Sequence, residues 1–172
     1  MTTPGTGDAG TGTAAKVEVV RSSVVRAPKD EVWARVVSAG GVRDEFRPLL
    51  FMRFPGRLAG ASIEDLPLGR SIGRAWILLG GVVPVEYDDL VITELDGPRY
   101  FQERSSLGSC RVWEHRRELE QVSGDARSTR VTDTLRAIPR APVPARLVQV
   151  MVGALFTHRH RRLARWAAAT DP

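Results

Sequence analysis

The spacing of apolar residues divides the chain into an initial strand, two short helices, a strand-rich middle and a long final helix. Residues 16–27 are rich in valine and predict a strand. Pro28 suits the first turn of the helix that follows, and Asp30 and Glu31 favour the positive end of its dipole. Two consecutive glycines are expected to end that helix, and a second short helix is predicted within residues 42–52.

Between residues 58 and 138 the pattern changes to short runs of strand-forming residues separated by Gly, Pro, Asp and Ser. The connections are only a few residues long, so neighbouring strands are expected to be antiparallel, because a parallel pair needs a crossover of about a dozen residues or more. The six strands predicted in this way comprise residues 58–66, 70–79, 83–95, 100–107, 110–122 and 127–138.

Residues 145–169 predict the longest helix, which has one broad stripe of apolar side chains when positions are counted at about 100° per residue. An open antiparallel sheet with one apolar face has to be covered, and no other predicted element is long enough to cover it. We therefore expect an α+β fold in which a curved sheet of six to seven antiparallel strands wraps around the C-terminal helix. The space between such a sheet and its helix is a natural ligand pocket.

Strand parity places a histidine and an aspartate on the inner face of the last two predicted strands. His115 and Arg117 share one face of the first of these strands, and Asp133 lies in the apolar row of the second. A hairpin centred near Gly124 would bring His115 opposite Asp133 and Arg117 opposite Val131. Residues that face each other in this way have Cβ atoms about 5 Å apart. The sequence therefore predicts a His–Asp pair inside the cavity.

One arginine of the final helix, Arg159, falls within the apolar stripe. A buried guanidinium without a partner is too costly, so Arg159 is expected to have an anionic partner, either Asp133 or Glu103. His158 and His160 lie about 100° to either side of it, on the flanks of the stripe. We interpret Arg159 as a clamp between helix and sheet, with an anion site for a ligand as the alternative.

The residues expected to contact a ligand come from the sheet and from the final helix. Two tryptophans are interpreted as cavity wall. The His–Asp pair has two interpretations: it fixes the sheet, or it performs acid–base work in which the aspartate orients the imidazole and supports its protonated form. The predicted ligand-binding residues are Trp76, Trp113, His115, Asp133, Met151, Leu155 and Arg159.

Charge adds a further question, because the chain has a formal net charge of +5. All 25 basic residues except Lys16 and Lys29 are arginine and there is no asparagine, a skew that GC-rich codons produce. The surplus lies in residues 139–172, where six arginines accompany a single aspartate. Such a segment is compatible with binding to nucleic acid or to an anionic membrane. A solvated helix face is the preferred interpretation, and no specific nucleic-acid partner is expected.

Several classes of protein and site are not expected. The apolar runs are well short of the roughly 20 residues that a membrane span needs, and no signal peptide is predicted. Cys110 is the single cysteine, so no internal disulfide can form, which fits a cytoplasmic location. His158 and His160 face apart on a helix, so no metal site is expected, nor any cofactor. Residues 1–15 predict a disordered leader, whose GxGxxG-like run lacks the strand and helix of a dinucleotide site.

Four segments of the chain resemble the START-like superfamily, also called SRPBCC or polyketide cyclase/dehydrase-like. The run from Ser22 to Trp33 is similar to its first strand and first helix. Three later segments resemble the W-x-H strand, the T-x-x-D-type strand and the F-x-x-R-H helix of a ligand-binding subgroup; they are Trp113-Glu114-His115, Thr132-Asp133-Thr134-Leu135 and Phe156-Thr157-His158-Arg159-His160-Arg161-Arg162-Leu163. The similarity covers residues 17–166. The motif residues that carry over are Trp113, His115, Asp133 and Arg159.

This resemblance implies a helix-grip fold around a deep hydrophobic cavity, in a single domain predicted to span residues 16–169. The superfamily includes lipid and sterol carriers, hormone receptors and aromatase/cyclases of polyketide pathways, so catalysis does not follow from the fold. The leading hypothesis is a protein that binds or carries a small hydrophobic molecule, lipid-like or polyketide-like. The alternative is a polyketide cyclase or dehydratase in which His115 is the acid–base group, Asp133 orients it and Arg159 stabilises a developing enolate. The sequence leaves open whether the protein forms a homodimer.

Overall fold

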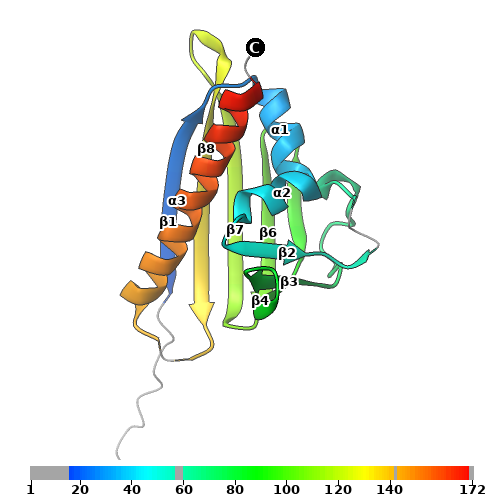
Figure 1. The fold of residues 1–172 in the computed structure, drawn as a ribbon, viewed down its shortest axis with the longest axis vertical. Coiled ribbons are helices and arrows are strands. Elements are labelled where there is room, and N and C mark those ends of the chain that lie inside the picture. Colours follow the sequence, from blue (N-terminus) through cyan, green and yellow to red (C-terminus); the bar gives the residue numbers. More distant parts are fainter. Residues whose placement is uncertain (1–15, 57–59, 142, 171–172) are drawn as a thin grey trace, which may run out of the picture.

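The structure, a computed structural model, describes residues 16–56, 60–141 and 143–170. A curved antiparallel sheet holds a long helix, α3 (Ala145–Thr170), against one face, and two short helices, α1 (Lys29–Val37) and α2 (Ala39–Phe46), lie on the same side (Figure 1). This α+β arrangement confirms the fold predicted from the sequence. The leader predicted for residues 1–15 lies outside the described residues.

Within the described residues eight strands pair in one antiparallel sheet, against the six to seven expected. They are β1 (Val17–Val25), β2 (Leu50–Arg53), β3 (Arg74–Leu79), β4 (Val83–Asp89), β5 (Ile92–Asp96), β6 (Tyr100–Leu107), β7 (Cys110–Val122) and β8 (Asp125–Pro139). The order is β1-β8-β7-β6-β4-β3-β2, and β5 pairs with the other part of β6. The first strand is therefore hydrogen-bonded to the last one, next to the helix that follows it.

The strand count differs because three segments were assigned wrongly. Leu50–Arg53 is a strand at the edge of the sheet and not the end of a helix, since it pairs with β3. The predicted strand 83–95 is divided in two because β4 pairs with the end of β6 and β5 with its beginning. Residues 58 and 59 of the predicted strand 58–66 lie outside the described residues, and Ile63–Asp65 forms a short 3-10 turn that Ser62 caps.

The glycine pair predicted to stop the first helix lies inside the second one. α1 ends at Val37, and the Ser38 hydroxyl accepts a hydrogen bond of 3.0 Å from the Gly41 N–H, which caps α2. A Cβ atom at Gly41 would collide with the backbone carbonyl oxygen of Arg35, whereas one at Gly40 would meet open space. Only Gly41 is thus required by a close approach of backbone, and it allows α2 to follow α1 with a single residue between them.

Two apolar clusters fix α3 on the sheet. The C-terminal half of α3 packs through Leu163 and Ala167 against α1 and the sheet, and the N-terminal half packs through Phe156 against β1, β7 and β8. Val32 and Val36 are the fully buried residues of α1 in the first cluster. None of the described helices has the length and hydropathy of a membrane-crossing segment.

Candidate functional site

A cavity of about 450 Å³ lies between the sheet, the two short helices and α3. Its wall is mostly aliphatic and aromatic, with contributions from α2, from β2, β3, β4, β6 and β7, and from one face of α3. The polar residues of the wall are Ser62, Glu86, Asp88, Glu103, Ser109, Cys110, His115 and Arg159. The cavity predicted from a curved sheet gripping a helix is therefore present.

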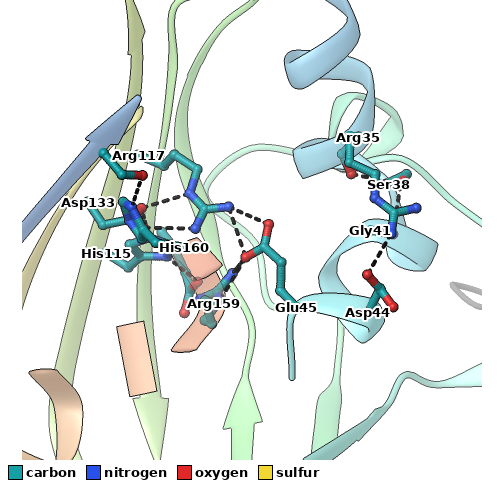
Figure 2. A network of polar contacts seen from close by, with 12 residues as sticks. Arg35, Ser38, Gly41, Asp44, Glu45, His115, Arg117, Asp133, Arg159 and His160 are labelled. Carbon is teal, nitrogen blue, oxygen red and sulfur yellow. Dashed lines mark hydrogen bonds and ion pairs between the residues drawn. The ribbon is translucent and has the colours of Figure 1, made fainter. Parts of the chain in front are cut away.

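A buried ionic cluster lies next to this cavity, with Arg117 of β7 at its centre (Figure 2). The Arg117 guanidinium donates from Nε to Oδ1 of Asp133 at 2.7 Å and from Nη2 to Oδ2 at 2.8 Å. Its Nη1 donates to Oε1 of Glu45 at 2.8 Å. This fork joins two carboxylates that come from β8 and from α2, and all three side chains are at most 2% exposed.

Arg159 does have an anionic partner, but that partner is Glu45. Its Nε donates to Oε2 of Glu45 at 2.9 Å, so the predicted partners Asp133 and Glu103 are wrong. The guanidinium also lies over the rings of Phe46 at 4.9 Å and of Phe156 at 4.7 Å, and it forms part of the cavity wall. Glu45 is thus shared between two arginines, one from the sheet and one from the helix.

Two histidines complete the cluster on the carboxylate of Asp133. Nε2 of His115 lies 2.8 Å from Oδ1, and Nε2 of His160 lies 2.8 Å from Oδ2. Nδ1 of His160 is bonded to the Ser23 hydroxyl at 2.6 Å, which ties α3 to β1. His160 is therefore buried in the cluster and not on a flank, whereas His158 is on the outside and bonds the carbonyl oxygen of Arg47.

The two carboxylates of the cluster and Arg117 are held in their charged forms. Burial works to raise the pKa of Asp133, but the charge and hydrogen bonds of Arg117, followed by those of His115, outweigh it and hold the pKa well below its ordinary value. The pKa of Glu45 is lowered in the same way, against its burial, by Arg117 and Arg159. Burial would lower the pKa of Arg117, yet the two carboxylates raise it. The cluster is a set of compensating ions inside the protein.

The predicted contact between His115 and Asp133 is confirmed, but the predicted register is off by two residues. His115 is opposite Leu135, and Arg117 is opposite Asp133 where Val131 was expected. The pairing shifts between Gln121 and Val122, so extra residues of β8 are taken up close to the turn. A shift by two keeps each side chain on its predicted face, and His115 still reaches Asp133 diagonally.

His115 is the member of this pair that meets the cavity. Its ring lies edge-on between Phe101 and Phe156, with centroids 5.6 Å and 5.1 Å away, and it belongs to the cavity wall. Its Nδ1 lies 3.7 Å from Oε2 of Glu103. Asp133 is 0% exposed and stands behind the histidine, so it is placed to orient His115 and not to touch a bound molecule.

Of the other predicted ligand residues, Trp113, Met151 and Leu155 line the cavity together with Arg159. The interpretation of Trp76 as cavity wall is wrong. Its side chain is 42% exposed and packs edge-on against Tyr87 at 5.7 Å, because Ala75 and Ile77 form the inward row of β3. The ligand-binding roles of Trp113, Met151, Leu155 and Arg159 stay predictions.

Glu45 and Asp88 carried no predicted role, and Arg117 was placed on the inner face without a partner. Arg117 lies in an inward row of its strand together with Leu119. A buried guanidinium needs an anionic partner, so the argument applied to Arg159 would also have predicted a partner for Arg117. Glu45 directly precedes the buried Phe46, but a short helix with two glycines gave no clear periodicity.

No group of three or more His, Cys, Asp or Glu residues among the described residues is placed to hold a metal ion.

Residues 23–167 match the model of a family described as Domain of unknown function (DUF8410). The chain belongs to the DUF8410 family. No curated protein matches this DUF8410 chain.

Solved structures share the fold of the DUF8410 chain. A START superfamily protein from Mycobacterium smegmatis superposes with a TM-score of 0.65 at 11% identity, over 90% of this chain and 99% of that one. A conserved protein from Geobacillus kaustophilus gives 0.64 at 11% identity, over 91% and 97%. The Zhui aromatase/cyclase from Streptomyces gives 0.59 at 15% identity, over 89% and 92%. The DUF8410 chain therefore has the START-like, helix-grip fold that its motifs resemble, and identities this low establish the fold alone.

Proposed function

We propose that the protein binds or carries a small hydrophobic molecule, lipid-like or polyketide-like, in the cavity between the sheet and α3. The observation that carries this proposal is a cavity of about 450 Å³ with a mostly aliphatic and aromatic wall. Sites for small molecules occupy about 300 to 1,000 Å³ and are lined in this way. An apolar ligand in this space removes the wall from water, at roughly 25 cal/mol for each Å² buried.

The test is uptake of 1-methylpyrene, followed by its fluorescence, with a pair of variants on neighbouring positions of α3. Val152 lines the cavity, whereas Val150 is 68% exposed and does not line it. Val152→Trp fills part of the cavity and is expected to weaken binding about tenfold or more, while Val150→Trp leaves it unchanged. Equal binding by two folded variants would contradict the proposal. Extraction of the purified protein, with native mass spectrometry, then identifies any molecule that copurifies.

A second candidate function is that of a cyclase or dehydratase, and the position of His115 favours it. The ionised Asp133 carboxylate accepts from Nε2 of His115, which leaves Nδ1 as the nitrogen able to exchange a proton with a bound molecule. The apolar wall excludes water from such a reaction, and Arg159 contributes positive charge next to the space.

Turnover of a poly-β-keto thioester, followed by aromatic absorbance, tests this candidate. His115→Ala should abolish turnover, and His158→Ala, outside the cavity, should leave it intact. Unchanged turnover in folded His115→Ala protein would remove His115 from the reaction.

A further inference from the structure

Two buried carboxyl groups lie on the cavity wall and belong to neither the ionic cluster nor the His115–Asp133 pair. Asp88 on β4 and Glu103 on β6 both line the cavity and are only 6% and 7% exposed. The pairing of β4 with β6 brings the two strands together, and the charge of Glu103 acts on the carboxyl group of Asp88. Two carboxylates accept hydrogen bonds but donate none, so neither can satisfy the other while both are ionised.

The surroundings of Asp88 favour its protonated form. Burial raises the pKa of Asp88 well above its ordinary value, and the charge of Glu103 and its hydrogen bond add to the effect. This part of the cavity wall therefore carries two acidic side chains, and protonation of Asp88 is favoured over its ionised form.

The protein supplies fewer hydrogen-bond donors than this pair can accept. Oδ1 of Asp88 and Oε1 of Glu103 accept no hydrogen bond from any donor group of the described residues. The Ser105 hydroxyl is the hydrogen-bond partner of Asp88, and it accepts a hydrogen bond of 3.2 Å from the Val91 N–H. Nδ1 of His115 stays 3.7 Å from Oε2 of Glu103, which is too long for a hydrogen bond. These two buried oxygens, on residues of the cavity wall, therefore lack a donor among the described residues.

No arginine of the described cavity wall bonds the pair, and the ring of His115 approaches Glu103 only to 3.7 Å. Arg159, the arginine of the wall among the described residues, is bonded to Glu45. Glu86 uses both carboxylate oxygens on backbone N–H groups, those of Tyr87 and Ser109. The unmet acceptors of Asp88 and Glu103 are thus the part of the wall that selects the polar end of a ligand.

We propose that the molecule bound in this cavity carries a hydrogen-bond-donating head group, a hydroxyl or an amine, that contacts Asp88 and Glu103. This inference rests on the proposed binding function and deepens it. A donor satisfies the acceptors that lack a partner, and an ammonium group also suits two acidic side chains. A carboxylate head group would add negative charge beside them, so an ionised fatty-acid-like head is excluded from this end of the cavity.

Four probes with one ring system test the inference in the wild-type protein: 1-methylpyrene, 1-pyrenemethanol, 1-pyrenemethylamine and 1-pyrenecarboxylic acid. We expect the alcohol or the amine to bind about tenfold or more tightly than the methyl compound, and the carboxylate to bind more weakly than it. The difference between the alcohol and amine arms tells whether the head group is neutral or cationic. Equal affinities of all four probes would overturn the inference.

Variants locate the preference on the pair. Asp88→Leu and Glu103→Met replace the acceptors by apolar groups of similar size, and each should reduce the tenfold preference to about threefold or less. Asp89→Leu is the matched control, since Asp89 neighbours Asp88 but bonds Ser71 and lies outside the cavity wall. A preference that survives in both folded cavity variants would overturn the inference.

The same titrations separate the two proposals. If 1-methylpyrene binds and the donor probes gain nothing, the cavity binds apolar molecules and only the head-group inference fails. If none of the four probes binds, the binding function and the inference fail together.

Discussion

Nη1 of Arg117 lies 2.8 Å from Oε1 of Glu45, and this ion pair joins β7 to α2 across 72 positions of the chain. The same guanidinium holds Asp133 of β8, and Glu45 in turn holds Arg159 of α3. A single salt-bridged path therefore links the sheet, a short helix and the long helix around the cavity. Pairs buried this deeply add little net stability over apolar residues, but losing one partner leaves an uncompensated ion.

Arg117→Met is accordingly expected to destabilise the protein by about 3 to 5 kcal/mol, because Asp133 and Glu45 would lose their shared counterion. Arg116→Met is the control, since Arg116 lies on the other face of β7 and pairs with the exposed Glu118, and it should cost at most about 1 kcal/mol. Urea denaturation followed by circular dichroism measures both. Similar values for the two variants would contradict the central place of Arg117.

The lowered pKa values of Asp133 and Glu45 predict a loss of stability in acid. A carboxyl whose pKa is lower in the folded state stabilises the protein above its unfolded pKa, and this contribution is lost as pH falls through the folded pKa. The free energy of unfolding should therefore fall by several kcal/mol below about pH 5. Urea titrations at successive pH values test this, and a free energy that stays constant down to about pH 2 would refute it.

Asp88 should act with the opposite sign, because its pKa is raised. The folded protein binds this proton more tightly than the unfolded chain, so stability decreases as pH rises from the unfolded pKa through the folded one. Asp88→Asn cannot ionise, and it should raise the unfolding temperature at neutral pH by roughly 2 to 4 °C. The gain should shrink as the pH approaches about 4, near the unfolded pKa. Asp89→Asn serves as the control, and a gain independent of pH would exclude titration as the cause.

Adjacent glycines of α2 should respond oppositely to alanine. Gly41→Ala places a Cβ atom against the carbonyl oxygen of Arg35 and should cost about 2 kcal/mol or more. Gly40→Ala meets open space and should stabilise the helix by roughly 0.5 to 1 kcal/mol. Thermal unfolding of both variants provides the measurement, and equal effects would show that the helix junction is not closely packed.

Cys110 offers a chemical report on the cavity, because it is the single cysteine and lines the wall. Burial raises the pKa of its thiol, so modification by a disulfide reagent at about pH 8 should be at least tenfold slower than for free cysteine. Saturation with 1-methylpyrene should slow it further. Modification that is as fast as for free cysteine, or insensitive to the probe, would contradict an enclosed wall at this position.

The local pattern of apolar and polar residues was sufficient to predict the fold. It also predicted the position of those site residues that depend on strand parity. His115, Trp113 and Asp133 were placed on the correct face because alternation depends on neighbours in the chain. The partner of Arg159 was not predictable in this way, because Glu45 reaches it only once α2 has folded against α3. Trp76 was wrongly predicted to line the cavity for a related reason. A large aromatic residue suggests a place on the cavity wall, but its neighbours Ala75 and Ile77 take the inward positions of β3.

The position of Arg159 and His160 near the middle of α3 gives the helix two unequal halves. From these residues onward the helix is tethered by ions and by the core around Leu163, whereas its first turns are held by apolar side chains, among them Val148 and Val152. Any widening of the cavity along those first turns breaks dispersion contacts and leaves every ion pair of the cluster intact. Under the proposed binding function, exchange of a guest molecule along the first turns would not require unfolding of the ionic cluster.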